Sequence, residues 1–489
     1  MTKSYYYSDN ARPSWKIPEP LHEYIKKTHN VSQLESIYVS ISRKPFVLIQ
    51  GPPGTGKTQT ILGLLSAILH ATPSRIFGVV AIAVSFIPVE QKRNGSTADK
   101  QKLGGTGKDK DSIRSAILDE AVIVCSTLSF SGSSLLGKLN HISREVLGRL
   151  IFPTLNHGFD IVIIDDAAQA IKPATLAPLV TGCKQVGDPA QLPATVISKV
   201  AKRFGYDTSL FKRLQRAGYL VKMLKIQYRM HPQIRSFPSK DFYDEALEDG
   251  SGVEDYTTRD WHKYGCFGPF CFFDIEGVEE SRTNKNEVEF VLLLYHKLVN
   301  MYPELKSSSQ IAIMSPYSGQ VKEFQERFKK IFGAESQKVV DITTVDGCQG
   351  REKDVVILLS CVRANQDKGG IGFLKDNRRM NVAITRAKSS VLVVGSASKL
   401  WNGNKHWRNL IKSAENRGCL FKVSEPYDSF FREKNLGSLK VKAEEAQAAE
   451  RDDPRDNENM AVYVNTGDAD DNEYGRWGLS GSQLCRCRR

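Results

Sequence analysis

An eight-residue stretch, GPPGTGKT at positions 51–58, constrains the fold of this chain more than any other feature. It fits the pattern G-x-x-x-x-G-K-[ST], in which glycines let backbone N–H groups wrap around phosphate. The apolar run FVLIQ precedes it, and the helical pattern KTQTILGLLSAILHA continues from its end. A strand, a glycine-rich turn and a helix in this order are the context of a phosphate-binding loop. We therefore expect an α/β domain that binds a nucleoside triphosphate at the end of a strand.

This loop assigns roles to individual side chains. We expect Lys57 to reach the β- and γ-phosphates of ATP, and the hydroxyl of Thr58 to hold Mg²⁺. The helix that begins there adds a dipole that favours negative charge at its N-terminus. The predicted cofactor-binding residues of this stretch are Gly51, Pro52, Pro53, Gly54, Thr55, Gly56, Lys57, Thr58 and Gln59.

A pair of carboxylates follows another apolar run. In DIVIIDDAAQA, the run IVII ends in Asp165 and Asp166. We expect Asp165 to hold Mg²⁺ and Asp166 to act as the base that orients the attacking water. The alternative is an acidic pair that only caps the following helix. A phosphate loop and an acidic pair would also fit a metabolic kinase or an unrelated ATPase, so the rest of the chain has to decide.

Short apolar runs alternate with helical patterns along most of the chain, which predicts doubly wound α/β domains with parallel sheets. The pattern restarts after VKMLKIQYRMHP, so we place a boundary near Lys222. An acidic tail with few apolar residues indicates disorder. The predicted division is an N-terminal extension (1–29), a first domain (30–222, with an insertion at 75–120), a second domain (223–428) and a disordered tail (429–489).

Charge and composition narrow the class of partner. The 489 residues carry a net charge of +13. This surplus favours an anionic partner, nucleic acid first, and the alternative is a soluble protein that is merely basic. The longest uncharged run is too short to span a bilayer as a helix, so we expect no membrane partner. The nine cysteines show no zinc-binding spacing, which predicts reduced and packed thiols.

Three polar residues in later motifs extend the triphosphate site. Gln191 lies in VGDPAQLPA, Arg229 in QYRMHP and Arg386 in RRMNVAITRAK. Arginine is well suited to neutralise charge on a transferring phosphoryl group. Because both arginines belong to the predicted second domain, they would reach ATP only across a cleft, which couples hydrolysis to a domain motion. Alone, each arginine would also fit a surface ion pair.

In this order, the motifs resemble those of a superfamily 1 helicase of the 1B, nonsense-decay-helicase-like group, closest to the senataxin family. The resemblance implies two tandem RecA-like domains that hydrolyse Mg·ATP and move 5′ to 3′ along single-stranded RNA or DNA, with an RNA–DNA hybrid as a further substrate. It implies a nuclear location, with a cytoplasmic pool as the alternative, and it names no protein partner. The matching segments lie within residues 30–427, interrupted by one large gap, and are NVSQLESI, GPPGTGKT, ILDEAVIVCSTLS, GDPAQLPATV, FGYDTSLFKRLQ, QYRMHPQIRSFPS, SPYSGQV, TVDGCQGREKD, GIGFLKDNRRMNVAITRAK and WRNLIKSAENRGC.

The resemblance also implies residue roles at the nucleotide. Gln33 would read the adenine edge, Tyr228 would pack against the base and Glu352 would contact the ribose. Gln191 would sense the γ-phosphate. The two arginine fingers would be Arg229 and Arg386.

Other residues lie in motifs that touch the single strand. They are Ser126, Thr127, Pro316, Tyr317 and Thr344. Hydroxyl and backbone groups that hold phosphates are largely blind to sequence, which suits a motor protein. For each hydroxyl residue, a capping or turn role is the alternative.

The chain departs from that family at three places. Asp166 stands where the family has glutamate, which withdraws the carboxylate by about 1 Å and predicts slowed hydrolysis. The stretch before ILDEA is short, Phe86 stands where asparagine would follow Ser85, and the inserted β-barrel on its helical stalk is missing or reduced. The strand before Gly187 is expected to have only about four residues, which would displace Gln191.

Together these observations predict an ATP-dependent RNA or DNA helicase. The departures keep a second function open, an ATP-regulated nucleic-acid clamp with impaired hydrolysis. The third function, an α/β ATPase that acts without nucleic acid, would show no salt-dependent binding to single strands.

Overall fold

The structure is a computed structural model, and it describes most of the chain between residues 17 and 432. The described residues are 17–42, 46–71, 76–80, 123–128, 161–176, 183–192, 196, 198–277, 279–280, 283–306, 310–335, 339–359 and 371–432. Residues 76–80 of the expected insertion form a strand of the first sheet, and the rest of that segment with its Ser85–Phe86 pair lies outside the described residues, as do the start of the N-terminal extension and the expected tail beyond residue 432.

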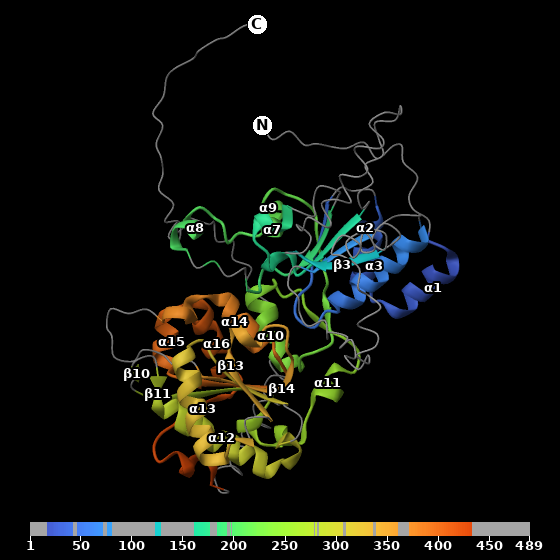
Figure 1. Ribbon diagram of the computed structural model, residues 1–489. Coiled ribbons are helices and arrows are strands. Elements are labelled where there is room, and N and C mark those ends of the chain that lie inside the picture. The colour runs from blue at the N-terminus through green and yellow to red at the C-terminus, as the bar shows by residue number, and fades with distance from the viewer. Residues whose placement is uncertain are drawn as a thin grey trace, which may run out of the picture. The chain divides into compact units, whose positions relative to one another are not determined.

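A six-stranded sheet organises the first half of the chain (Figure 1). It runs in the order β3-β2-β4-β5-β1-β6, and all its pairings are parallel. Because β5 pairs with both β1 and β4, the carboxyl ends of these three strands meet at one edge of the sheet. The strands are β1 (Phe46–Gln50), β2 (Ile76–Val80), β3 (Ile123–Thr127), β4 (Ile161–Asp165), β5 (Cys183–Gly187) and β6 (Val221–Met223).

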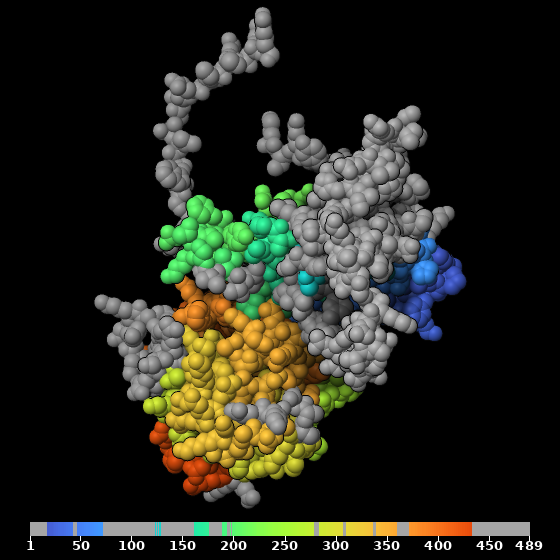
Figure 2. Space-filling view, in the orientation of Figure 1, coloured from blue at the N-terminus to red at the C-terminus, as the bar shows by residue number. Residues whose placement is uncertain are grey.

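Helices pack on this sheet and position the loop after β1. Three of them, α1 (Glu19–Thr28), α2 (Val31–Ile41) and α3 (Lys57–Ala71), lie together in Figure 1. Ile37 of α2 and Leu64 of α3 belong to one apolar cluster with β1, so the helix that follows the phosphate loop is fixed to the sheet. The other helical segments of this half are η1 (Ala167–Gln169), α7 (Lys172–Leu176), α8 (Lys199–Arg203) and α9 (Leu210–Arg216), and α8 lies at the molecular surface (Figure 2).

A second six-stranded parallel sheet organises the other half, in the order β13-β12-β14-β15-β9-β16. When each sheet is numbered from its own first strand, both orders read 3-2-4-5-1-6. The two sheets confirm the predicted α/β class with two doubly wound parallel sheets in tandem. The strands are β9 (Phe270–Ile275), β12 (Ile311–Ser315), β13 (Val340–Thr344), β14 (Lys353–Leu359), β15 (Ala387–Gly395) and β16 (Leu420–Val423).

The second sheet is covered on both faces. Val355 and Ile357 of β14 pack in a cluster with α12 (Lys285–Met301) and α13 (Ser318–Phe332). Their neighbours Val356 and Leu358 pack in a second cluster with three other helices, α10 (Pro232–Phe242), α14 (Asn377–Ile384) and α16 (Lys405–Asn416). Adjacent residues of a strand point to opposite faces, so β14 is buried on both.

Short elements connect these layers. Two strand pairs lie outside the main sheets, one parallel (β7 with β8) and one antiparallel (β10 with β11). The short elements are β7 (Ile226–Gln227), β8 (Glu248–Asp249), α11 (Val253–Thr257), η3 (Asp260–Lys263), η4 (Gly265–Phe267), β10 (Glu279–Glu280), β11 (Thr283–Asn284), η5 (Pro303–Lys306), η7 (Asp346–Cys348), η8 (Gly372–Lys375), α15 (Ala397–Gly403) and η9 (Tyr427–Phe431).

The structure gives the length of the strand that the sequence expects to be short. That strand is β5, which has four residues before Gly187, as expected, and includes Gly187 as its fifth. It pairs with β1 over its whole length, so ladder hydrogen bonds to a central strand extend it although three of its residues are not strongly apolar. The boundary that we predict near Lys222 falls inside β6, which pairs with β1.

Two further findings concern cysteines and membranes. Among the cysteines whose side chains the structure describes, Cys266, Cys271 and Cys348 are buried free thiols, as the expected packing requires, whereas Cys125 is exposed. Among the helices that the structure describes, none has both the length and the apolar composition that crossing a membrane requires.

Candidate active site

The phosphate loop connects β1 to α3 and curls over the side chain of Lys57. Gly54 and Gly56 both have a φ of 77°, a left-handed conformation that side chains rarely adopt. The Nζ of Lys57 donates a hydrogen bond to the carbonyl of Gly51 at 2.8 Å. Burial lowers the pKa of Lys57, while the nearby carboxylates of Asp166 and Asp188 oppose that shift.

A cavity of about 710 Å³ adjoins this loop and is lined by residues of both halves. The first half contributes Lys57, Thr58, Asp165, Asp166 and Gln191, and the second half contributes Arg229, Glu352 and Arg386. All six residues that we predict to be catalytic therefore lie around one space. Sequence reasoning did not name four of its polar and glycine residues, which are Gln169, Asp346, Gln349 and Gly350.

The two aspartates stand at the carboxyl end of β4. Asp165 is the last residue of the strand, and its Oδ1 accepts a hydrogen bond from the backbone N–H of Asp166 at 2.8 Å. Burial, reinforced by the charge of Asp166, raises the pKa of Asp165 to about 6. Asp166 has a φ of 51°, in the left-handed region where aspartate is tolerated better than most residues. The pair therefore presents two carboxyl groups to the cavity, one of them in an environment that disfavours its charge.

Gln191 lies within the site despite the expected displacement. Its Nε2 donates to Oδ2 of Asp188 at 3.0 Å, and its Oε1 accepts from Nη2 of Arg386 at 3.2 Å. The side chain is 6% exposed. Gln191 thus lies at the cavity beside the second half, so the expectation that it would be pulled out of place is wrong.

Arg386 and Arg229 approach the cavity from the second half. Arg386 is buried, and burial together with the charge of Arg229 lowers its pKa to about 10. Its guanidinium also donates to the carbonyl of Val382 at 3.3 Å. Arg229 donates to the carbonyl of Thr385 at 3.1 Å and pairs with Glu352, while its Nε is buried without a hydrogen-bond partner among the described residues. Two oriented guanidinium groups thus face the same cavity as Lys57.

Arg229 also contacts the phosphate loop directly. The backbone N–H of Tyr228 donates to the carbonyl of Gly54 at 2.9 Å. A Cβ atom placed at Gly54 would lie 2.7 Å from the Cβ of Arg229, so only glycine fits there. The arginine that follows the first sheet in the chain is therefore packed against the loop of the first half.

Three residues expected at the base and ribose already have protein partners. Glu352 pairs with Arg229 and lies 3.6 Å from Nζ of Lys388; burial would raise its pKa, but these cations outweigh burial and lower it. Gln33 accepts a hydrogen bond from the backbone of Asn30 at 3.1 Å and donates to the carbonyl of Thr55 at 3.2 Å.

Tyr228 differs from those two residues because its ring is 43% exposed. Its hydroxyl accepts a hydrogen bond from Nδ2 of Asn30 at 3.1 Å, and the ring packs against the backbone of Gly250. Gln33 and Tyr228 lie at the phosphate loop but are not among the residues that line the cavity.

A buried network that sequence reasoning missed joins the halves beside Gln191. The hydroxyl of Tyr243 donates to Oδ2 of Asp188 at 2.7 Å and accepts from Nδ2 of Asn381 at 2.8 Å. Asn381 also donates to the carbonyl of Ala190 at 3.0 Å. Burial raises the pKa of Asp188 although Lys57 and these hydrogen bonds oppose the shift. Asp188 and Asn381 lie within motifs that the sequence singles out, whereas no local signal marks Tyr243.

A second contact across the cavity was also missed. The Nε2 of Gln349 donates to Oε1 of Gln169 at 2.5 Å. Gln169 belongs to η1, directly after the aspartate pair, and Gln349 follows η7 in the motif TVDGCQGREKD. The quoted motifs contain both residues, but neither spacing indicates that they meet.

The residues predicted to touch a single strand lie at strand ends. Ser126 and Thr127 end β3, and Pro316 follows β12. Tyr317 is buried, and its hydroxyl donates to the carbonyl of Ile371 at 3.2 Å. Thr344 ends β13, and its hydroxyl accepts from the backbone N–H of Gly347 at 3.2 Å, which is the capping role given above as the alternative.

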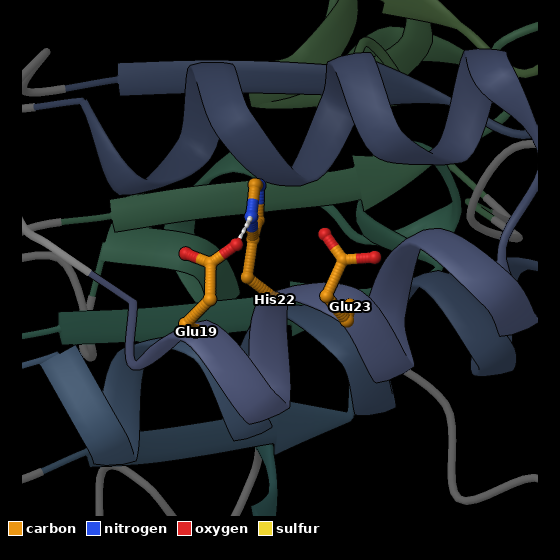
Figure 3. Close-up of side chains that lie close together, drawn as sticks. All are labelled: Glu19, His22 and Glu23. Atoms are coloured by element: carbon orange, nitrogen blue, oxygen red, sulfur yellow. Dashed lines mark ion pairs between the residues drawn. The ribbon is translucent and has the colours of Figure 1, made fainter.

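On α1, the side chains of Glu19, His22 and Glu23 lie close together (Figure 3). Among the described residues, they form a group of side chains of the types that can bind a metal ion. His22 Nδ1 lies 3.9 Å from Glu19, and its Nε2 lies 2.9 Å from the hydroxyl of Tyr38. Glu23 accepts a hydrogen bond from Lys26 at 2.8 Å. These surface contacts within the helix and to α2 account for the group without a metal.

The fold and the site together define a class of protein: tandem RecA-like α/β domains, with a phosphate loop on the first sheet and arginines on the second half directed at the same cavity. Comparison with known proteins narrows this class. One AAA domain model matches residues 28–103 and 81–199, and a second AAA domain model matches residues 206–398.

Curated relatives give the family. The probable helicase MAGATAMA 3 of Arabidopsis thaliana is 50% identical over 564 residues, which covers 90% of this chain and 66% of the relative. A probable helicase of Dictyostelium discoideum is 34% identical and covers 84% of this chain and 55% of its own length. The human probable helicase senataxin is 36% identical and covers 67% of this chain and 12% of its own length. The chain belongs to the superfamily 1 helicases and is similar to their senataxin group.

This chain is shorter than the relatives that it matches. The chain spans from about two thirds to about an eighth of the length of these three relatives. The alignment with the Arabidopsis relative runs over 564 residues, which is longer than the whole chain of 489. That relative therefore carries residues within the aligned region that this chain lacks.

Proposed function

We propose that this chain is an ATP-dependent helicase that hydrolyses Mg·ATP between two RecA-like domains, at residues 30–222 and 223–428, and moves 5′ to 3′ along single-stranded RNA or DNA. The observation that carries the proposal is the shared cavity. It brings a phosphate-loop lysine and a carboxylate pair of the first half within reach of two arginines from the second half. Such an arrangement ties triphosphate chemistry to the relative position of the two halves.

The residues around the cavity fit Mg²⁺. Thr58 and Asp165 both line it, and hydroxyl and carboxylate oxygens are the ligands that this ion prefers. Burial raises the pKa of Asp165 to about 6, so a nearby cation would stabilise its charged form. Mg²⁺ would neutralise charge on the β- and γ-phosphates.

Each catalytic side chain then has a role. Lys57 would bind the β- and γ-phosphates, and Asp166 would hold a proton of the attacking water. Gln191, positioned by Asp188, would orient that water or the γ-phosphate. Arg386 and Arg229 would stabilise charge on the phosphoryl group as it transfers. Gln33, Tyr228 and Glu352 would contact the base and the ribose, which requires a change in the hydrogen bonds that they make now.

Several features support nucleic acid as the partner. The chain carries a net charge of +13, and its relatives are named helicases. Ser126, Thr127, Pro316 and Thr344 stand at carboxyl ends of parallel strands, where open α/β sheets bind ligands. We extend the proposal to RNA–DNA hybrids and to a nuclear location, with a cytoplasmic pool as the alternative.

A second candidate is an ATP-regulated clamp that binds nucleic acid with impaired hydrolysis. Two observations favour it. Asp166 is one methylene shorter than the glutamate of the family, and the Arabidopsis relative carries aligned residues that this chain lacks.

Steady-state ATP hydrolysis by the purified chain, with and without single-stranded oligo-U RNA, tests the proposal. RNA-stimulated turnover is expected, together with displacement of a duplex that has a 5′ overhang but not of one with a 3′ overhang. Salt-dependent RNA binding without turnover would support the clamp instead. A third outcome is ATP turnover that RNA does not stimulate, in a chain that shows no salt-dependent binding to RNA. This outcome would indicate an ATPase that acts without nucleic acid.

A substitution tests the second half within the same assay. Arg386→Ala should lower kcat by about a thousandfold, because an arginine finger contributes that order of rate. Arg351→Ala is the matched control, since its exposed side chain pairs with Asp341 while its backbone carbonyl, which accepts a hydrogen bond from Arg386, is kept. Equal turnover in the two variants would exclude Arg386 from the chemistry.

A further inference from the structure

An exposed aromatic side chain stands beside the strand ends of the second sheet. Phe373 lies on η8, and its side chain is 52% exposed. Its ring centroid lies 5.6 Å from that of Tyr317, which directly follows the end of β12. Tyr317 itself is only 6% exposed, so of these two neighbouring rings Phe373 is the one offered to solvent.

The backbone around Phe373 is held rigidly. The hydroxyl of Tyr317 accepts a hydrogen bond from the backbone N–H of Phe373 at 3.2 Å and donates to the carbonyl of Ile371 at 3.2 Å. Gly372 between them has a φ of 57°, and a Cβ there would lie 2.5 Å from the same hydroxyl. The neighbours Ile371 and Leu374 are buried. Phe373 is thus presented outward by a fixed turn, and rigid aromatic surfaces bind with little loss of side-chain entropy.

A cation lies over the same ring. The guanidinium carbon of Arg379 is 5.2 Å from the centroid of Phe373. Asp346 holds this guanidinium in place through two hydrogen bonds of 3.0 Å each, from Nε and Nη2. Lys375, on the same turn, is exposed. An exposed aromatic face beside positive charge is the chemistry that recognises a base and its adjoining phosphate.

We propose that Phe373 is a stacking platform for one base of the single strand, with Tyr317 as the residue that positions it. The proposal rests on the proposed function, because it names a contact for the strand that a helicase would hold. A single strand is the occupant that fits, since its bases are free to stack and its phosphates match Arg379 and Lys375, whereas a duplex keeps its bases stacked on one another. The sequence motif pointed to Tyr317, whose hydroxyl is instead used to hold the turn.

Binding of fluorescein-labelled oligo-U RNA to the full chain, measured by anisotropy over a range of salt concentrations, tests this contact. Phe373→Ala should raise Kd by about tenfold or more, the usual effect of losing one stacked base. The slope of log Kd against log salt should stay unchanged, because no phosphate contact is lost. Phe373→Trp should restore the affinity of the original chain.

The controls separate stacking from a loss of structure. Tyr24→Ala removes another exposed aromatic, on α1, and should leave Kd unchanged. If Phe373→Ala merely damaged the fold, the salt slope and the melting temperature would fall together and tryptophan would not rescue binding, which would overturn the proposal. An unchanged Kd for Phe373→Ala in a chain that binds RNA would also overturn it and would leave Phe373 to a protein partner. If the original chain binds no RNA, the proposed function fails first and the stacking platform with it.

Discussion

The two halves of this molecule share one strand order and differ in the loops that the strands carry. After its first strand, the first sheet continues into GPPGTGKT and a helix that begins at Lys57. After its first strand, the second sheet continues into a longer, glycine-poor connection and a helix that begins at Lys285, capped by Asn284. The same scaffold therefore carries the candidate triphosphate site in one half, while the matching connection of the other half has a different sequence, so the proposed chemistry depends on the loops and not on the fold.

The ends of other equivalent strands repeat this contrast. The fifth strand of the first sheet leads to Asp188, which accepts a hydrogen bond from Gln191 at the cavity. The fifth strand of the second sheet leads to Ala397, whose backbone N–H donates to Asp274 at 2.7 Å. Asp274 ends the region of β9 that pairs with β15, and it serves there to hold the start of a helix. An acidic residue near a strand end thus holds the start of a helix in one half and the side chain of Gln191 in the other.

The first lysine of each equivalent helix gives the largest expected difference between the halves. Lys57→Ala should lower kcat for ATP hydrolysis by about a thousandfold, because it removes the cation that faces the phosphates. Lys285→Ala alters the matching position of α12 and should change kcat by less than about twofold. Steady-state turnover of both variants measures the difference. Similar losses in both would mean that the phosphate loop does not hold ATP as proposed.

Asp165, at the end of the fourth strand of the first sheet, should make the free energy of unfolding depend on pH. Burial raises the pKa of Asp165 from 3.8 to about 6, so the folded state holds this proton more tightly than the unfolded state. The contribution of this group to stability is fully present below pH 3.8 and is lost as pH rises through about 6. Without Mg²⁺, Asp165→Asn should therefore raise the free energy of unfolding at pH 7.5 by up to about 3 kcal/mol, and much less at pH 4.

Chemical denaturation at these two pH values measures this effect. Asp260→Asn, at an exposed residue of η3, is the control and should shift stability little at either pH. The same Asp165→Asn protein should also lose Mg²⁺-dependent hydrolysis. A variant that is less stable than the original chain at pH 7.5 would show that Asp165 is stabilised in its charged form after all.

The length of the side chain at position 166 should change the rate of ATP hydrolysis. Asp166→Glu should raise kcat by about tenfold to a hundredfold, since a misplacement of about 1 Å costs up to that amount. The gain is limited because the φ of 51° at this position suits aspartate better than glutamate. Asp166→Asn keeps the size but removes the base and should be slower than either. A glutamate variant no faster than the original chain would place the defect elsewhere.

The smallest expected effect concerns the network where the halves meet. Tyr243→Phe removes the hydroxyl that joins Asp188 to Asn381 and should lower the free energy of unfolding by about 1–3 kcal/mol, because buried polar groups lose a partner. Tyr295→Phe, at another buried tyrosine on α12, is the control. Thermal denaturation of both variants measures the difference. Equal losses would mean that the network adds nothing beyond ordinary packing.

How far the sequence could predict this molecule depends on distance along the chain. The phosphate loop, its strand and its helix are local, and the structure has them where the sequence expects them. The bond between Gln169 and Gln349 joins residues 180 positions apart, and no periodic pattern indicates such a contact. The cap at Thr344 shows a further limit, because the same hydroxyl fits a strand end and a nucleic-acid motif equally well until its partner is seen.

The strand before Gly187 shows that strand pairing matters as well as residue type. Cys183, Lys184 and Gln185 do not read as a buried strand, yet β5 includes them because it pairs with β1 along its whole length and with β4 over part of it. Pairing with a strand on each side gives β5 its backbone hydrogen bonds. These pairings, and not the apolar character of its residues, make the segment a strand.

The contact between Gly54 and Arg229 gives this molecule a very short mechanical connection. Only five residues separate β6 from Arg229, and Tyr228 is hydrogen-bonded to the loop that would hold the triphosphate. A small shift of that loop would reach Arg229 through one hydrogen bond and one van der Waals contact, without passing through either sheet. The position of the phosphate loop would then determine when Arg229 is placed for hydrolysis. A methyl group at Gly54 would push the phosphate loop and Arg229 apart. ATP binding would then no longer be coupled to ATP hydrolysis.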